Sequence, residues 1–381
     1  MQLTPLPVRA PVADYVMQAD ALLDAWNAGD PGAIAIARHK HPKFLDDTIK
    51  WLPKRLSDEQ AREMPFEFAD AQLTVARWYD FASWPRLVEH VEAVTRDSSP
   101  ESRFEVAVDA VVGGDVAALA AMLAEHADLV RARSTRVTHF DPPVHRATLL
   151  HYIAANGVEG YRQKTPPNAV EIAKTLLGAG AEVDAQADMY GHPSTTMDLL
   201  VSSSPPDAAG LQTALAETLL DSGAAIDGVG ETTPLMIALA FGFRETAEML
   251  ARRGARVDSL AAAAGLGRLD DARQRLGPAS AEDRHRALAL AAQHGHADMV
   301  RLLLDAGEDP NRYNPKANHG HSTPLHQAIA AGHEPVVRLL VERGARLDIE
   351  DTIYHGTPLG WAIYCNRPAL AQYLRGRGAP E

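Results

Sequence analysis

The chain has 381 residues, of which 46% are hydrophobic and 23% are charged, the balance of a water-soluble globular protein. Its formal net charge of −13 argues against nucleic acid as a partner, because such binders need basic residues to displace counterions from phosphates. No apolar run approaches the roughly 20 residues that cross a bilayer, so no membrane association is expected. A single cysteine, Cys365, excludes a disulfide framework and favours a reducing cytoplasmic location.

The N-terminal quarter predicts a flexible tail followed by a small helical module. Residues 1–14 are proline-rich and lack the apolar stretch of a signal peptide, so we expect a tail there. Helical periodicity follows in residues 14–28 and 66–79, and Ser83 is a candidate N-cap for a third helix. The module is assigned to residues 15–98. Four tryptophans are expected in its core: Trp26, Trp51, Trp78 and Trp84.

One segment of this module, residues 38–62, is locally basic. It holds seven Lys or Arg residues against four acidic ones. A solvated polar face is favoured there over a docking site for an acidic partner. The stretch Asp-Ser-Ser-Pro at 97–100 is expected to be the junction with the rest of the chain.

Beyond this junction the sequence repeats itself. Residues 323–345 read TPLHQAIAAGHEPVVRLLVERGA, and a second copy, offset by 34 residues, reads TPLGWAIYCNRPALAQYLRGRGA. Related strings lie at 233–255, 286–307 and 148–157. These strings resemble the ankyrin repeat, a unit of two helices and a finger-like loop. The resemblance implies an all-α fold over residues 101–381: an ankyrin solenoid of about eight helix pairs with short β-like fingers, preceded by the helical module.

The physics of one unit explains its spacing. Thr323 can cap a helix that begins at Pro324, where the missing N–H costs nothing. Gly332 and Gly344 are expected to end the two helices in the left-handed conformation, which has no Cβ clash in glycine. The apolar residues in between fall on one face of each helix: Leu325, Ala328, Ile329, Val336, Val337, Leu339 and Leu340. Neither helix can bury that face alone, so each unit needs neighbours.

The array departs from its pattern at several places. Residues 259–276 predict a shortened helix pair without a finger, and residues 158–168 and 202–210 are insertions. In the last unit Asn366 stands where a glycine is expected. The string ADAQLTVARWYDFASWPRLVEHVE at 69–92 also resembles a helical module that precedes ankyrin arrays in bacteria, which implies a bacterial origin.

The histidines fall into two groups. His151 and His326 occupy the T-x-L-H position of the repeat, and His296 and His333 occupy the Gly-His position. The resemblance implies structural roles for these four, through hydrogen bonds to neighbouring backbone. Other histidines and several tyrosines fall on the predicted fingers, whose tips point away from the core.

The ankyrin resemblance places partner contacts on the fingers and on the exposed ends of the first helices. Carried over unit by unit, that surface consists of Asp188, Tyr190, His192, Phe241, Gln293, His294, Tyr313, His319, His321, Tyr354, His355 and Tyr364. Exposed aromatic side chains are typical of protein-binding surfaces. We therefore interpret the chain as a scaffold that binds another protein, and expect no cofactor, metal or catalytic residue.

Two alternatives use the same finger residues. Three imidazoles from neighbouring fingers, with His319 and His321 two residues apart, could bind zinc. A cluster of His, Asp and Tyr side chains could instead bind a small molecule in the groove or run acid–base chemistry on it. No nucleophile motif, phosphate loop or paired carboxylates support a specific reaction, so the scaffold is preferred.

Overall fold

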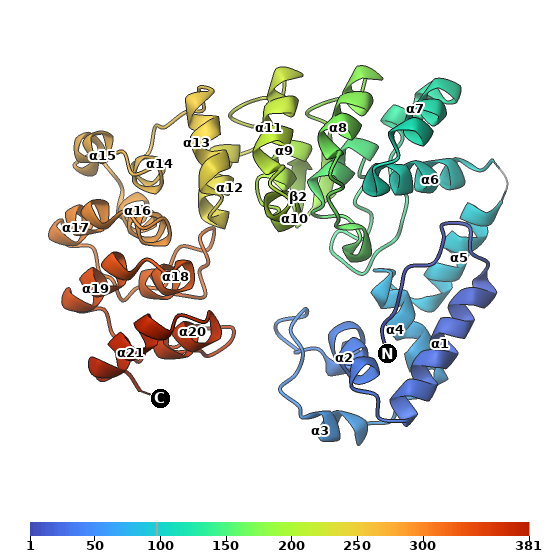
Figure 1. The fold of residues 1–381 in the computed structure, drawn as a ribbon, viewed down its shortest axis with the longest axis horizontal. Coiled ribbons are helices and arrows are strands. Elements are labelled where there is room, and N and C mark those ends of the chain that lie inside the picture. Colours follow the sequence, from blue (N-terminus) through green and yellow to red (C-terminus); the bar gives the residue numbers. More distant parts are fainter. Residues whose placement is uncertain (97, 381) are drawn as a thin grey trace. The chain divides into compact units, whose positions relative to one another are not determined.

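The computed structural model describes residues 1–96 and 98–380 (Figure 1). They divide into two compact units, the first ending at Ala225 and the second beginning at Ile226. Within the described residues both units are built from helices, and the regular strands form one antiparallel hairpin. Its strands are β1 (Gln186–Met189) and β2 (His192–Thr195). The all-α ankyrin architecture predicted from the repeats is confirmed.

The N-terminal part of the first unit is a bundle of short helices. These are α1 (Val12–Asn27), α2 (Pro31–Lys40), the 3₁₀ helix η1 (Pro42–Phe44), α3 (Asp58–Arg62), α4 (Phe68–Trp78) and α5 (Trp84–Thr95). Helix α1 contacts α4, and Trp26 stacks on Phe66 with ring centroids 4.3 Å apart. Ser83 occupies the N-cap position of α5, but its side chain makes no capping hydrogen bond.

Two expectations for this part need correction. Trp51 is 59% exposed and is therefore not a core residue, whereas Trp26 is buried and Trp78 and Trp84 pack against the core. The tail expected over residues 1–14 packs on the bundle, because its apolar side chains Leu3 and Ala10 are buried. The division into a module over 15–98 and an array over 101–381 stays a proposal, and Asp97 in the expected junction lies outside the described residues.

The basic segment at 38–62 is largely neutralised by ion pairs. Arg38 lies 2.8 Å from Asp58, and Lys43 lies 2.7 Å from Asp70. Two weaker pairs join Lys40 to Asp80 at 3.4 Å and Lys54 to Asp47 at 3.6 Å. These internal pairs agree with a solvated polar face.

The rest of the first unit contains three helix pairs. They are α6 (Pro100–Gly113) with α7 (Val116–Glu125), the 3₁₀ helix η3 (Leu149–Ala154) with α8 (Ala169–Gly178), and α9 (Thr196–Leu200) with α11 (Gln212–Asp221). The 3₁₀ helix η2 (Ala127–Arg131) follows α7. The predicted insertions carry the short helices η4 (Gly160–Arg162) and α10 (Ser204–Ala208).

The second unit contains five helix pairs, which brings the described residues to the predicted eight. They are α12 (Pro234–Phe241) with α13 (Arg244–Arg252), α14 (Leu260–Gly265) with α15 (Leu269–Leu276), α16 (Ala281–Gln293) with α17 (Ala297–Asp305), α18 (Pro324–Ala331) with α19 (Glu334–Glu342), and α20 (Pro358–Tyr364) with α21 (Pro368–Gly376). Helix α18 contacts both α16 and α20, as stacked repeats require. The fingerless pair predicted at 259–276 is confirmed by α14 and α15.

Residues with positive φ end the helices where the repeat pattern requires them. Gly332, at the end of α18, has φ 80°, and Gly344, after α19, has φ 90°. Asn366 takes the same left-handed conformation, with φ 52°, in the last unit. Asparagine is one of the few non-glycine residues that tolerate this conformation, which explains the replacement.

Replacing Gly344 with valine is expected to cost about 1–2 kcal/mol of unfolding free energy, because a β-branched side chain is strained at this φ. A Cβ at Gly344 would meet nothing within 4 Å, so the cost isolates backbone strain. Urea unfolding of Gly344→Val measures it. Gly344→Asn should be milder, and Gly376→Ala, inside α21, should be neutral or stabilising. Equal stabilities of Gly344→Val and wild type would contradict the unit boundary.

Histidines of the repeats hydrogen-bond the backbone of neighbouring units. The His326 side chain is fully buried, with Nδ1 2.8 Å from the Thr323 hydroxyl and Nε2 donating to the Gly356 carbonyl at 3.2 Å. His296 and His333 bond the carbonyls of Gly265 and Gln293, each at 3.0 Å. Burial lowers the pKa of His326 to about 4, so its imidazole is neutral in the folded protein.

This burial makes the protein acid-sensitive. The pKa of His326 is about 6.5 in an unfolded chain and about 4 in the folded protein. The unfolded chain therefore binds a proton first as the pH falls from 6.5 to 4, and the folded protein loses stability over that range. Between pH 7.5 and 5, the unfolding free energy of the wild type should therefore fall by on the order of 1–2 kcal/mol more than that of His326→Gln. Urea unfolding at the two pH values measures the difference. The exposed His39→Gln is the control for the substitution itself. Parallel pH profiles for wild type and His326→Gln would refute this origin.

Candidate functional site

Five aromatic and imidazole rings of the second unit form a continuous surface feature, which we call the ring strip: Phe241, His319, His321, Tyr354 and Trp361. The ring centroids of Phe241 and His319 are 6.3 Å apart, and those of His319 and His321 are 6.0 Å apart. From His321 the next centroids are Tyr354 at 6.3 Å and Trp361 at 6.0 Å. Phe241 is 53% exposed and Tyr354 is 52% exposed. Three separate segments of sequence therefore build one surface.

The uneven repeat explains how Phe241, at the end of α12, meets a finger residue from two units later. Helices α14 and α16 are preceded by short connections, whereas residues 308–322 before α18 form a long loop. That loop is closed by a hydrogen bond from the Asn314 N–H to the Ser322 carbonyl at 2.8 Å. His319 lies within it at φ 57°, a left-handed conformation that a histidine holds only when its surroundings enforce it.

Asp351 holds the second finger of the ring strip in place. Its buried carboxylate accepts hydrogen bonds from the backbone N–H groups of Ile353, Tyr354 and Gly356 at 3.0, 2.6 and 2.8 Å. It also accepts the Trp361 indole N–H at 2.9 Å. Burial acts to raise the pKa of Asp351, but these four donors outweigh it and lower that pKa. The carboxylate is therefore an ionised anchor for two of the strip's rings.

The ring strip carries no formal charge near neutral pH. Burial, together with the neighbouring imidazole, lowers the pKa of His319. Burial also lowers the pKa of His321, although the Asp351 carboxylate acts in the opposite direction. Both imidazoles are consequently neutral, and the other three rings are a phenyl, a phenol and an indole. The result is an uncharged and partly apolar surface.

Other predicted finger residues of this unit lie at the surface without joining the strip's ring contacts. Tyr313 is 42% exposed, and its hydroxyl donates to the Glu350 carbonyl at 2.7 Å. His355 is exposed, and its Nδ1 lies 3.6 Å from the Glu350 carboxylate. Tyr364 is 91% exposed at the end of α20.

The prediction that Gln293 and His294 belong to the surface needs correction. His294 is 5% exposed, and its Nε2 donates to the Leu239 carbonyl at 2.8 Å. Gln293 is half-buried and donates to the Ala240 carbonyl at 3.0 Å. Because the shortened unit exposes the carbonyls at the end of α12, these two side chains bond them and serve the fold.

Three predicted residues lie in the first unit, on the β1–β2 hairpin. Tyr190 is 64% exposed at the hairpin turn with φ 55°, and its hydroxyl bonds Asn156. His192 is exposed on β2, and Asp188 on β1 is half-buried. These residues form a separate feature of the first unit.

The described residues offer little to the two alternatives, a zinc site and an acid–base site on the fingers. Among residues 1–96 and 98–380, no group of three or more His, Cys, Asp or Glu side chains is placed to hold a metal ion. Asp351, the acidic residue beside the ring strip, has its oxygens committed to four donors. Separately, no helix in the described part of the chain is long and apolar enough to cross a membrane.

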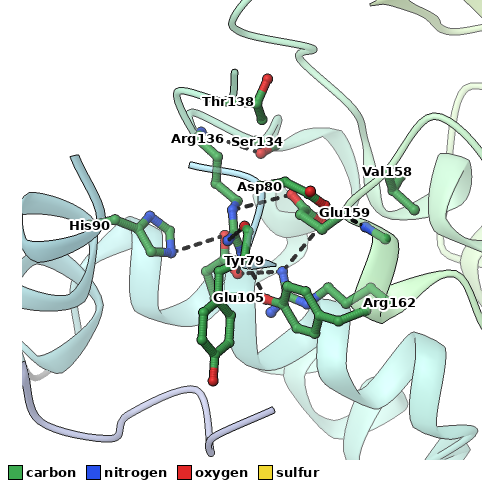
Figure 2. Close-up of polar contacts among 12 residues, drawn as sticks. Tyr79, Asp80, His90, Glu105, Ser134, Arg136, Thr138, Val158, Glu159 and Arg162 are labelled. Carbon is green, nitrogen blue, oxygen red and sulfur yellow. Dashed lines mark hydrogen bonds and ion pairs between the residues drawn. The ribbon is translucent and has the colours of Figure 1, made fainter. Parts of the chain in front are cut away.

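A second feature, in the first unit, was not predicted from sequence: a buried network of charges (Figure 2). Glu105 on α6 lies 2.6 Å from the Arg162 guanidinium, 3.4 Å from that of Arg136 and 3.6 Å from the His90 imidazole. Glu159 also belongs to the network, 3.3 Å from Arg136 and 3.6 Å from Arg162, as does Asp109, 3.1 Å from Arg162. The side chains of both arginines are 3% exposed.

The network joins the N-terminal helices to the first repeats. Arg136 donates to the Tyr79 carbonyl at 3.1 Å, and its guanidinium lies 4.3 Å from the centre of the Phe81 ring. The Asp80 carboxylate accepts the Gly160 N–H at 2.6 Å. Arg162 comes from the insertion at 158–168, where the repeat pattern assigns no role to individual residues, so sequence reasoning passed over it.

The charges support one another electrostatically. Burial acts to raise the pKa of Glu105, but Arg162, Arg136 and His90 together lower it to about 2. Burial lowers the pKa of His90 to about 4, so this imidazole is neutral at pH 7. A cavity of about 420 Å³ adjoins the network and is lined in part by Tyr15, Tyr79 and His90. It lies apart from every predicted finger residue.

Replacing Glu105 with glutamine should destabilise the first unit by about 3–5 kcal/mol, because two buried arginines would lose their shared counter-charge. The matched control is Glu89→Gln, in the exposed Arg86–Glu89 pair at 2.7 Å, which should change stability little. Thermal and urea unfolding measure both. Comparable effects of the two substitutions would show that the network contributes no more than a surface pair.

Comparison with known proteins identifies the repeats. The family model described as "Ankyrin repeats (3 copies)" matches residues 259–351 and 288–380. The chain is 36% identical over 98 residues to "Ankyrin repeat and SAM domain-containing protein 6" of Mus musculus, which covers 26% of this chain and 11% of that protein. It is 34% identical over 98 residues to "NF-kappa-B inhibitor cactus" of Drosophila yakuba, covering 26% of this chain and 19% of that protein.

A bacterial relative and a solved structure complete the comparison. The chain is 33% identical over 154 residues to a "Putative ankyrin repeat-containing protein" of Treponema pallidum, covering 40% of this chain and 43% of that protein. The chain thus spans less than half of the length of each of these relatives. The crystal structure of the human ASB11 ankyrin repeat domain matches with 22% identity and a TM-score of 0.37, over 72% of this chain and 98% of that one.

The stacked helix pairs, the left-handed exits and the capping histidines define an ankyrin-type repeat protein. The family match agrees, and the chain contains ankyrin repeats over residues 259–380. Ankyrin repeats generally mediate contacts between proteins. The resemblance inferred from the Thr-Pro-Leu strings is confirmed.

Proposed function

We propose that this protein is a binding scaffold that recognises a partner protein through the finger loops of its second unit, with the ring strip as the contact centre. The observation that carries the proposal is a group of neighbouring rings, two of them about half exposed, in which hydrogen bonds to Asp351 hold the segment of Tyr354 and Trp361. Aromatic side chains offer a large contact area and lose little conformational entropy on binding. The exposed Tyr313, His355 and Tyr364 extend this surface, and the hairpin residues Asp188, Tyr190 and His192 are proposed as contacts of the first unit.

The chemistry of the strip supports binding over catalysis. A catalytic groove needs groups that can exchange protons with a bound molecule, held in a water-excluding pocket. The Asp351 carboxylate instead accepts hydrogen bonds from four donors. One relative is itself named as an inhibitor of NF-kappa-B, which is in keeping with an action on another protein.

Substituting single rings tests the proposal. Phe241→Ala and Tyr354→Ala should each weaken partner binding by about 2 kcal/mol or more, roughly 30-fold, because aromatic anchors near an interface centre dominate its energy. Both side chains are about half exposed, so folding should change little. Photo-crosslinking in the source cells identifies proteins bound to wild type, and calorimetry with the purified partner gives the affinities.

The matched control is Phe140→Ala, a phenylalanine of the first unit that is 46% exposed and stacks beside His139 and His145. Partner affinity should survive this change. Loss of binding in Phe140→Ala but not in Phe241→Ala would move the contact centre to the first unit. Unchanged affinity in all three variants would refute binding through exposed rings.

We further propose a bacterial origin and a cytoplasmic location. The Treponema pallidum relative and the resemblance of residues 69–92 support the origin, and the single Cys365, which forms no disulfide, supports the location. Cell fractionation followed by immunoblotting tests the location. Recovery of the protein outside the cytoplasm would contradict it.

A further inference from the structure

We infer that the ring strip binds an extended, uncharged segment of the partner protein that carries proline or aliphatic side chains at every second position. This inference rests on the proposed function and specifies what the surface recognises. It follows from three properties of the strip: its charge, its spacing and its rigidity.

Charge complementarity excludes a charged segment. The five rings are neutral, and Asp351 beside them has its carboxylate fully occupied by donors from Ile353, Tyr354, Gly356 and Trp361. A charged side chain laid on this surface would lose hydration without direct contact to a counter-charge, because the ionised Asp351 carboxylate is buried, and this loss is costly. Proline and aliphatic side chains have no charge to dehydrate. Burying their apolar area against the exposed faces of Phe241 and Tyr354 lowers the free energy of binding.

Spacing favours an extended segment. Successive centroids along Phe241, His319, His321 and Tyr354 are 6.3, 6.0 and 6.3 Å apart. Every second side chain of an extended chain points to the same face, at a repeat of roughly 6.4–6.8 Å. The spacing of neighbouring rings is therefore close to the spacing of same-face side chains in an extended chain.

The strip also offers a hydrogen-bonding group to the backbone of such a segment. Within the described residues the His321 imidazole makes ring contacts with His319, Tyr354 and Trp361 but no hydrogen bond. A neutral imidazole has one donor and one acceptor nitrogen. It can therefore bond a carbonyl or an amide of a bound extended chain. Proline in the segment lowers the ordering cost, because its backbone is already restricted.

Rigidity makes the strip ready to bind. The Thr352 N–H donates to the His321 carbonyl at 2.8 Å, which ties the two fingers together. Asp351 fixes Tyr354 and Trp361 on the second finger. Since these contacts exist without a partner, binding costs little further ordering of the protein.

The test uses fluorescein-labelled twelve-residue peptides and the full chain. The probe peptide repeats Pro-Ser-Val-Ser, one comparison peptide replaces each Val with Glu, and another is an amphipathic helix of equal length. Fluorescence anisotropy should show the probe binding at least tenfold more tightly than either comparison peptide. Phe241→Ala and His321→Ala should each raise the Kd of the probe tenfold or more, whereas Phe140→Ala should leave it unchanged.

Equal or tighter binding of the helical or Glu-containing peptide would overturn the inference, as would no measurable binding of the probe. Loss of probe binding in Phe140→Ala alone would overturn it as well. The proposed function is judged separately by the affinity of the crosslinked partner for the same variants. If Phe241→Ala weakens the partner but the probe never binds, the scaffold function stands and the extended-segment inference fails.

Discussion

An ankyrin helix has an apolar face that its own pair cannot cover. In α18 and α19 the buried side chains include Leu325, Ile329, Val337 and Leu340, and they are covered only when neighbouring pairs such as those of α16 and α20 stack on them. The turn between units must therefore return the chain to the same stacking position each time. Left-handed residues such as Gly344 make that turn possible, because they reverse the chain without a Cβ clash.

Since stacking fixes the helices, the connections between them are free to vary, and their variation creates the candidate site. Two short connections in the middle of the second unit leave the end of α12 uncovered by fingers of their own. The long loop at 308–322 reaches that end and places His319 beside Phe241. The surface feature therefore depends on an irregularity of the array, as functional loops on a rigid scaffold commonly do.

Buried charge plays a different part in the first unit. Glu105 and the two arginines beside it lie almost entirely out of water, and such a cluster is tolerable only when every charge has partners. The partners come from the N-terminal helices, the first repeat and the insertion at 158–168 (Figure 2). The cluster therefore links these three segments in the folded protein.

Periodicity determined the helix pairs and their left-handed exits, because these depend on residues three to twelve positions apart, and the ankyrin resemblance supplied the structural role of His326. The Thr-Pro-Leu strings located α12, α18 and α20 within a residue or two.

The tertiary structure decided which loop residues meet. Phe241 and His319 are 78 positions apart, and their contact depends on the length of three intervening connections. The repeat pattern predicts that His294 lies at the surface. In the structure its side chain is buried, because it donates a hydrogen bond to the Leu239 carbonyl, which the shortened unit leaves uncovered. Ion pairs such as Glu105–Arg162 produce no repeating pattern in the sequence. Each pair needs only two residues far apart in the chain, and neither residue is unusual in its own segment.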